Sequence, residues 1–334
     1  MYPSIKLSWL YDGASVSLYF LAIAVGFFCA AVLMGRQSLR LGIKRDDYQD
    51  FAIWMLILGV LGARLMHVLV DGFLMDYVHL CADPMQLDGR ALQSLEPCAS
   101  NLECLQDQQA NRDIGAICNP TDGLCYPQQD CLRWLKFWAG GLTVYGALLM
   151  CISFAYVFMK RRNWSFARMA DIAGPAVFFG VAVGRLGCLA AGCCYGDLCD
   201  LEAIAIQFPQ GSLAYQHHYD EHFHLLNTQW QEGVRASLPI WPSQLISSAY
   251  NFAIFAIGYF ILRPRKRFHG QVILICAIMY GVCRFGIEFI RADFRGGALG
   301  LSTSQLVSIP VLVLSVGLLV HLWRRAIARA PEGE

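Results

Sequence analysis

Seven long apolar stretches alternate with polar segments along the 334-residue chain. Each has close to the roughly 20 residues that an α-helix needs to cross the hydrocarbon core of a bilayer. They cover residues 17–34, 51–70, 138–159, 170–192, 243–262, 271–291 and 304–323. The pattern predicts an all-α integral membrane protein with seven transmembrane helices, and the odd number of spans places the two termini on opposite sides.

The polar connections alternate in charge. Lysine and arginine gather in four of them, as Arg36, Arg40, Lys44 and Arg45; Lys160, Arg161, Arg162 and Arg168; Arg263, Arg265, Lys266 and Arg267; and Arg324, Arg325 and Arg329. Basic loops are typical of the cytoplasmic side, so the N-terminus is predicted outside and the C-terminus in the cytoplasm. The N-terminus lacks the features of a cleavable signal peptide, so we expect the first span to remain in the mature protein.

The first outward loop, residues 73–137, is rich in cysteine. Its six cysteines are Cys81, Cys98, Cys104, Cys118, Cys125 and Cys131. An even number of cysteines in an outward loop favours disulfides formed in an oxidising compartment. Zinc is the alternative, although the loop lacks paired CxxC spacings and has no histidine between Cys98 and Cys131. We therefore predict a disulfide-stapled periplasmic insert, whose pairing the sequence leaves open.

The second outward loop, residues 197–241, contains the segment AYQHHYDEHFHLLNTQW. Its histidines could form a metal cluster, but aromatic residues among polar ones favour an interfacial loop with tyrosine and tryptophan anchors.

Composition narrows the class of protein further. The chain is 56% hydrophobic and 15% charged, with a mean hydropathy of +0.44, which is too apolar for a soluble domain. No separate soluble domain remains outside the spans and loops, so residues 1–334 are predicted to form a single transmembrane domain. The net charge is +1 and the basic residues lie beside apolar runs, which gives no indication of nucleic-acid binding.

Three arginines lie inside the predicted spans at equal depth. Arg64, Arg185 and Arg284 each lie 13 residues after Phe51, Ile172 and Gln271, respectively. At 1.5 Å per residue, each is roughly 20 Å from the cytoplasmic end of its span. Tyr145, on a span that runs inward, is predicted at the same level. Glu288 lies four residues beyond Arg284 and therefore one turn further out on the same helical face.

An arginine inside a span costs at least ~2.5–3.5 kcal/mol, and Glu288 is the one carboxylate that accompanies the three. An external anion is therefore expected to complete the site. A phospholipid phosphate suits it, because guanidinium binds phosphate oxygens in a bidentate way and stays charged. The alternative is an Arg284–Glu288 ion pair, with the other two arginines bonded to backbone carbonyls.

Small residues recur beside Arg185. Gly180, Gly184, Cys188, Gly192 and Gly196 follow one another at every fourth position, which on a continuous helix forms one ridge for close packing.

Several segments resemble the bacterial prolipoprotein diacylglyceryl transferase family. They are SLYFLAIAVGF with Tyr19, GARLMHVL (62–69), FWAGGLTVYGALL (137–149), GRLGCLAAGCCYG (184–196), WPSQL (241–245), YGVCRFGIEFIR (280–291) and STSQLVSIP (302–310). Together these motifs are specific, and they cover most of the chain outside the cysteine-rich loop.

The resemblance implies an enzyme of the bacterial inner membrane. It would transfer a diacylglyceryl group from phosphatidylglycerol to the lipobox cysteine thiol of a prolipoprotein signal peptide and release glycerol phosphate, without a cofactor or metal. Arg185 and Arg284 are assigned to the phosphate, with Arg64 in support. Glu288 orients Arg284, and Tyr145 exchanges a proton or hydrogen bond with the thiol. Further substrate contacts are expected from Tyr19, Gly184, Gly187, Cys188, Gly196, Ser243, Gln244 and Gln305.

Four positions depart from the family pattern. Well-known members have histidine at Tyr145, asparagine at Cys188, an acid at Cys193 and glutamate at Ser247. These departures leave two alternatives open. One is a catalytically inactive lipid-binding paralogue. The other is a membrane thiol-disulfide oxidoreductase that uses Cys188, Cys193, Cys194 and Cys199.

Overall fold

The computed structural model describes the greater part of the chain. The described residues are 4–6, 15–89, 92, 97–106, 116–137, 141–201, 203–210, 212–231, 233, 236–292, 297–298 and 300–328. Within them, seven helices are long and apolar enough to cross a membrane, which confirms the predicted number of spans.

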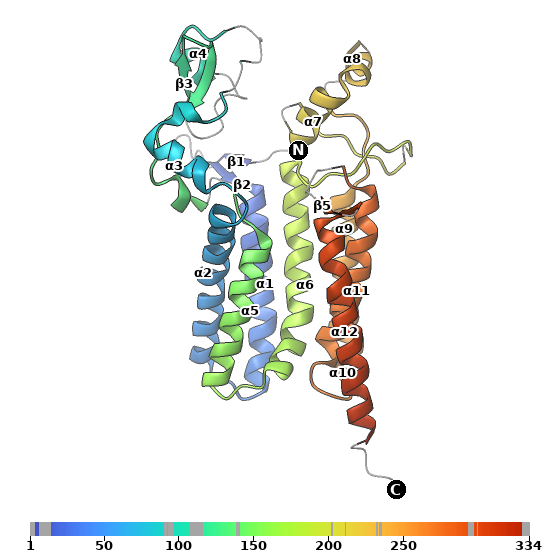
Figure 1. The fold of residues 1–334 in the computed structure, drawn as a ribbon. Coiled ribbons are helices and arrows are strands. Elements are labelled where there is room, and N and C mark those ends of the chain that lie inside the picture. Colours follow the sequence, from blue (N-terminus) through green and yellow to red (C-terminus); the bar gives the residue numbers. More distant parts are fainter. Residues whose placement is uncertain are drawn as a thin grey trace. The chain divides into compact units, whose positions relative to one another are not determined.

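The spanning helices follow the predicted apolar stretches and extend beyond most of them (Figure 1). They are α1 (Leu18–Arg40), α2 (Arg45–Leu69), α5 (Val144–Arg161), α6 (Phe166–Ala191), α9 (Ser243–Ala256), α11 (Gln271–Ile287) and α12 (Thr303–Ala328). A π-helical stretch, Ile257–Leu262, and the short α10 (Arg263–Arg265) continue α9. A 3-10 turn, Glu288–Ile290, continues α11. Residues 138–140, where the third apolar stretch was predicted to begin, lie outside the described residues.

Among the described residues, strands form three short antiparallel pairs outside the spanning helices, which the sequence analysis did not predict. They pair β1 (Ser4–Lys6) with β2 (Ser15–Ser17), β3 (Ala116–Asn119) with β4 (Leu124–Pro127), and β5 (Gly297–Ala298) with β6 (Leu301–Ser302). The loops also carry the short helices α3 (Leu74–Ala82), α4 (Asn101–Gln106), α7 (Leu213–Glu221) and α8 (Phe223–Gln231).

The chain divides into two compact units. One is Asp46–Trp164, and the other combines Met1–Arg45 with Ser165–Glu334. The single transmembrane domain expected from the sequence stays a prediction.

In the Asp46–Trp164 unit, α2 crosses α5 at a pair of glycines. A Cβ at Gly62 would lie 2.5 Å from the Gly146 carbonyl oxygen, so the backbones meet without side chains between them. Near the other end of these helices, Phe51 packs against Phe154, Phe158 and Trp164. The two helices are thus joined at both ends.

The cysteine-rich insert belongs to the same unit and is stapled as predicted. Its disulfides join Cys81 to Cys131, Cys98 to Cys118 and Cys104 to Cys125. The last two pairs join the α4 segment to the paired strands β3 and β4. The apolar core of this region is small, so disulfides are needed to stabilise its fold. The first pair ties the end of α3 to the segment that leads into α5.

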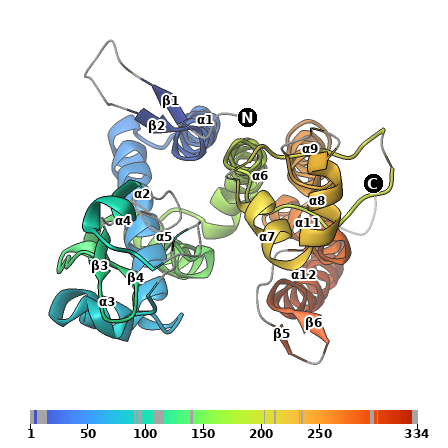
Figure 2. The ribbon, with the colours of Figure 1, turned by 90° about the horizontal axis from the view of Figure 1, so that it is seen from above.

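In the other unit, α6 lies between α1 on one side and α9 with α11 on the other (Figure 2). Gly180 and Gly187 make the close contacts to α1. A Cβ at Gly180 would lie 3.1 Å from the Gly26 carbonyl oxygen, and a Cβ at Gly187 would lie 2.8 Å from the Ala22 Cβ.

The predicted ridge of five small residues is therefore wrong in its extent. Helix α6 ends at Ala191, and Gly192 adopts a left-handed φ of 68° as its C-cap, so Gly192 and Gly196 leave the helical face. A Cβ at Gly184 would meet nothing within 4 Å. The residues of α6 that pack closely on α1 are Gly180 and Gly187, which are seven residues apart. Along the described helix, the predicted contact at every fourth residue is not formed.

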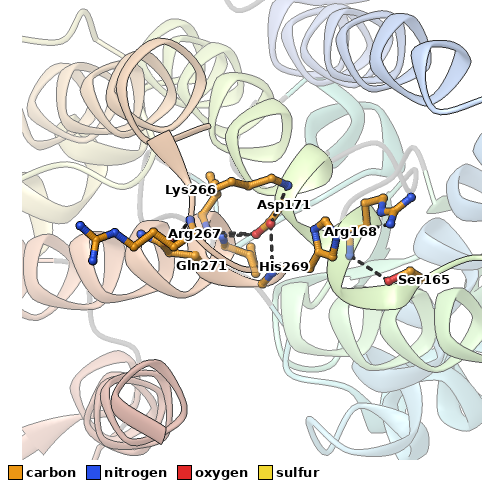
Figure 3. Close-up of polar contacts among 10 residues, drawn as sticks. Ser165, Arg168, Asp171, Lys266, Arg267, His269 and Gln271 are labelled. Atoms are coloured by element: carbon orange, nitrogen blue, oxygen red, sulfur yellow. Dashed lines mark hydrogen bonds and ion pairs between the residues drawn. The ribbon is translucent and has the colours of Figure 1, made fainter. Parts of the chain in front are cut away.

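A buried carboxylate at the other end of α6 anchors α11. Asp171 is fully buried and accepts hydrogen bonds from the backbone amides of Gly270, Val272 and Ile273 at 2.9–3.2 Å. Lys266 Nζ lies 3.0 Å from its Oδ2 (Figure 3). These amides open α11 and have no intrahelical acceptor, so Asp171 caps that helix from a neighbouring one. The sequence analysis did not identify this residue.

In the loop 197–241, His218 is 1% exposed, and its Nδ1 accepts a hydrogen bond of 3.1 Å from the backbone amide of Leu238. Burial, together with the neighbouring His217 and His222, lowers the pKa of His218 from 6.5 to about 4. The histidine is therefore neutral in the fold at neutral pH.

Acidification is expected to loosen this loop. Between pH 6.5 and about 4 the unfolded segment binds a proton at His218 that the folded segment does not, so its free energy of unfolding falls as pH falls through this window. The protection factor of the Leu238 amide in hydrogen exchange, which corrects for the intrinsic exchange rate at each pH, should fall as pH falls over the same range. The His218→Gln variant should lack this dependence, whereas His224→Gln, at an exposed histidine, should retain it. Equal pH dependence in all three proteins would contradict the assignment.

Candidate active site

Two side chains at the start of α9 bind the backbone of the turn that follows α6. Ser243 Oγ donates a 2.6 Å hydrogen bond to the Cys194 carbonyl oxygen, and Gln244 Nε2 donates a 2.9 Å bond to the Cys193 carbonyl oxygen. Both side chains are fully buried. The predicted residues Ser243 and Gln244 thus position the cysteine turn, and Gln244 Oε1 has no hydrogen-bond partner among the described residues.

Gly196 lies where three segments meet. It forms a β-bridge with Arg291, and a Cβ at this position would lie 2.5 Å from the Trp241 carbonyl oxygen and 2.9 Å from that of Ile290. Asp197 continues the contact by donating its amide to Ile290 O at 2.9 Å. A residue larger than glycine at position 196 would push apart the elements that carry the arginines.

Arg284 is fixed by two partners. Its Nη1 lies 2.5 Å from Glu288 Oε2 and its Nη2 lies 2.5 Å from Ser304 Oγ, with both charged side chains under 9% exposed. The ion pair with Glu288 is the one that the sequence analysis offered as an alternative to anion binding. It also agrees with the orienting role predicted for Glu288.

Arg185 differs from Arg284. Among the residues that the structure describes, none forms a hydrogen bond or an ion pair with its guanidinium group. Its electrostatic neighbours are Cys194, Cys188, Tyr280 and Arg291. Tyr250 lies within electrostatic range of both Arg185 and Arg284, which places these two predicted arginines in one region of the unit. Two guanidinium groups with one carboxylate leave an excess of positive charge there.

Arg291 was missed as part of this region. It follows Arg284 by seven residues in the segment RFGIEFIR and comes directly after the 3-10 turn that continues α11. A second arginine in the same motif was the available signal.

A polar stripe on α9 extends beyond the two predicted residues, Ser243 and Gln244, and its further members were missed. Ser243, Gln244, Ser247, Ser248 and Asn251 are each 3% exposed or less. Ser248 Oγ donates to the Ala182 carbonyl oxygen of α6 at 2.9 Å. Their spacing of three and four residues places them on one helical face, which an apolar reading of the stretch 243–262 obscures.

Gln305 has a structural role in the fold. Its Oε1 accepts a hydrogen bond from the Ser302 amide at 3.0 Å, while Ser302 Oγ accepts one from the Gln305 amide at 3.2 Å. This reciprocal pair is a capping box at the start of α12. The substrate contact predicted for Gln305 remains a prediction.

Tyr19 lies on α1 beside Gly187 of α6, where a Cβ would lie 3.2 Å from the Tyr19 carbonyl oxygen. Tyr19 lies within electrostatic range of Cys188, Cys193, Cys194 and Arg185. Gly187 brings the helices together at this point, and Gly184 faces open space.

Arg64 belongs to the other unit and is 6% exposed. Its Nε, Nη1 and Nη2 donate to the carbonyl oxygens of Trp134, Gly141 and Arg133 at 2.6–3.0 Å. Its guanidinium group also lies 5.1 Å from the centre of the Tyr77 ring. Arg64 therefore holds the segment that leads into α5. This agrees with the alternative given in the sequence analysis, in which an arginine bonds to backbone carbonyls instead of an anion.

Tyr145 is the second residue of α5 and is 40% exposed. Because Arg64 and Tyr145 lie in one unit and Arg185 and Arg284 in the other, the common level of these four residues stays a prediction.

An apolar cavity of about 930 Å³ lies beside Arg64, between α2, α3 and the segment before α5. Its lining includes Val60, Leu61, Tyr77, Trp134 and Phe137, with Arg64 as its charged member.

These features define a multi-pass membrane protein with a buried, cation-rich polar site among its helices. The chain matches the model of the prolipoprotein diacylglyceryl transferase family over residues 8–88 and 121–321, and it belongs to that family. The unmatched residues 89–120 contain Cys98, Cys104 and Cys118 of the insert.

Curated relatives agree with this assignment. The chain is 26% identical over 305 residues to the phosphatidylglycerol–prolipoprotein diacylglyceryl transferase of Clostridium tetani, covering 91% of this chain and 92% of the relative. It is 27% identical over 313 residues to the protein of that name from Neisseria gonorrhoeae, covering 90% of each. A shorter match of 33% identity over 208 residues, to the Paraburkholderia xenovorans protein, covers 57% of this chain and 66% of the relative.

Proposed function

We propose that this protein transfers a diacylglyceryl group from phosphatidylglycerol to the lipobox cysteine thiol of prolipoproteins and releases glycerol phosphate. Family membership supports the reaction class. The observation that carries the assignment of the site is the Arg185 guanidinium, which neighbours cysteines and tyrosines and has no carboxylate partner among the described residues. A phosphodiester is the substrate group that such a cation would bind.

The reaction breaks the bond between the glyceryl carbon and a phosphate oxygen. The substrate thiol loses its proton, its sulfur forms a bond to that carbon, and the electron pair of the broken C–O bond moves to the phosphate. Arg185 and Arg284 would stabilise the negative charge that grows on the phosphate. Glu288 and Ser304 hold Arg284 in place, so little reorganisation is needed as the charge develops.

Other groups are assigned supporting roles. Tyr19, Gly184, Gly187, Cys188 and Gly196 would shape the head-group site, and the polar stripe on α9 would hold it from behind. Tyr145 is the candidate partner of the substrate thiol. The apolar cavity beside Arg64 is suited to an acyl chain. We place the protein in the bacterial inner membrane, with the insert and the loop 197–241 on the outer side.

Transfer by the wild-type protein is the direct test. Purified in detergent with phosphatidylglycerol and a lipobox peptide, it should add a diacylglyceryl thioether to the peptide and release glycerol phosphate in equal amount. Mass spectrometry measures the first product and an enzymatic assay the second. A matched peptide with serine in place of the lipobox cysteine should remain unmodified, because a hydroxyl is a far weaker nucleophile than a thiolate. Binding of phosphatidylglycerol without any transfer would show a lipid-binding paralogue instead.

A further inference from the structure

Three cysteine thiols converge at the end of α6. The Sγ atoms of Cys188, Cys193 and Cys194 all lie within 4.8 Å of one another. Cys188 is buried in the last turn of the helix, and the other two form the turn that follows Gly192. Among the described residues, no histidine, aspartate, glutamate or further cysteine belongs to this group of potential metal ligands.

The turn that carries two of these thiols is strained and clamped. Cys194 has a φ of 59°, a left-handed conformation that is uncommon for any residue except glycine. The hydrogen bonds from Ser243 and Gln244 to the carbonyl oxygens of Cys194 and Cys193 hold it there. A costly backbone conformation that neighbouring buried side chains maintain is typical of a functional site. Here it keeps two adjacent thiols beside Cys188.

The surrounding charge suits an anionic cluster. Arg185 lies within electrostatic range of both Cys194 and Cys188. A divalent ion bound by three thiolates carries one net negative charge, which the guanidinium offsets.

The geometry also fits tetrahedral coordination. Zinc binds cysteine sulfur at ~2.3 Å, so sulfur atoms in a tetrahedral site are separated by about 3.8 Å. Side-chain rotation within the observed limit of 4.8 Å is enough to reach this spacing. Three protein ligands with a fourth position open are typical of catalytic zinc sites, whereas structural sites use four.

We propose that Cys188, Cys193 and Cys194 bind one zinc ion whose fourth position accepts the thiol that is to be alkylated. The second part rests on the proposed function. The incoming thiol binds zinc as thiolate and releases its proton to water. Its sulfur then bonds to the glyceryl carbon, and glycerol phosphate leaves with the electron pair of the C–O bond. Zinc keeps its oxidation state, and the thioether product, a weaker ligand than a thiolate, dissociates.

A metal at this site would also activate the substrate thiol. A metal that binds a thiol lowers its pKa directly, so the reaction would need no separate general base.

Metal content tests the site without reference to activity. The full-length protein, purified in detergent without chelators, should contain about one zinc per chain by atomic spectroscopy. Cobalt in place of zinc should give thiolate charge-transfer absorption. Replacing any one of the three cysteines by serine should remove most of both signals, whereas Cys29→Ser, at a cysteine on α1, should leave them unchanged. Thermal unfolding checks that each variant is folded.

The substrate thiol supplies the second readout. A lipobox peptide should shift the cobalt spectrum, and its serine analogue should not. Chelation of zinc should lower transfer at least about tenfold, with recovery on zinc addition. A fully active, zinc-free wild type, or a Cys188–Cys193 disulfide in the active protein, would overturn the zinc site and leave the proposed function standing. Stoichiometric zinc without transfer to any thiol peptide would support the metal site and overturn the proposed function.

Discussion

Replacement of Arg185 by alanine is expected to lower kcat about 10²- to 10³-fold, because removal of one charge-stabilising donor typically costs ~2.7–4 kcal/mol of transition-state stabilisation. Arg284 is already neutralised by Glu288, so Arg185 is the cation on which the leaving phosphate depends more. Arg185→Lys should recover only part of the loss, since an ammonium group cannot bind two phosphate oxygens in a fork. Turnover of phosphatidylglycerol with a lipobox peptide measures both effects.

Arg168→Ala is the matched control, because Arg168 is an exposed arginine near the start of the same helix. It should change kcat by less than about twofold, as expected for a surface charge remote from the chemistry. A folded Arg185→Ala protein with unchanged kcat would remove Arg185 from the reaction.

Replacement of Asp171 by alanine is expected to lower the free energy of unfolding by at least ~3 kcal/mol. The substitution leaves three backbone amides and the Lys266 ammonium without their acceptor, and each buried unsatisfied donor costs about 1–3 kcal/mol. Asp171→Asn should cost less, because its amide oxygen can still accept. Thermal unfolding in detergent, followed by circular dichroism, measures the difference.

Lys266→Met separates the cap from the ion pair. The amides of Gly270, Val272 and Ile273 would still bond Asp171, and the Lys266 side chain is 23% exposed. We therefore expect a cost of about 1 kcal/mol or less. An equal loss in Lys266→Met and Asp171→Ala would show that the ion pair, and not the helix cap, stabilises the fold.

The sequence predicted the spans because their length and polarity are local properties of the chain. It could not predict Asp171, because the amides that this carboxylate caps lie about 100 residues further along the chain, and only the folded bundle brings them together. The disulfide pairing was open for the same reason, since six cysteines allow 15 connectivities.

Side-chain contacts account for the remaining differences. The sequence indicated Arg185 as a candidate because this arginine lies deep inside an apolar stretch. The carbonyl contacts of Arg64 depend on the residues before α5, which its own helix does not reveal. The small-residue ridge failed because it assumed a helix that continues past Gly192. The capping box of Ser302 and Gln305, by contrast, is a short-range pattern that the sequence contains.

The partnership of α1 with α6 has a consequence for biosynthesis. Roughly 125 residues separate the end of α1 from the start of α6, so at ~5–20 residues per second the ribosome needs about 6–25 s to make them. During that time α1 must remain inserted in lipid without the helix that covers Gly26 and Ala22. Its mean hydropathy of 2.3 equals that of α12 and exceeds that of the other spans. Helix α1 is thus apolar enough to remain stably inserted in lipid by itself. The arginine-bearing α6 can then pack on it as soon as α6 leaves the translocon.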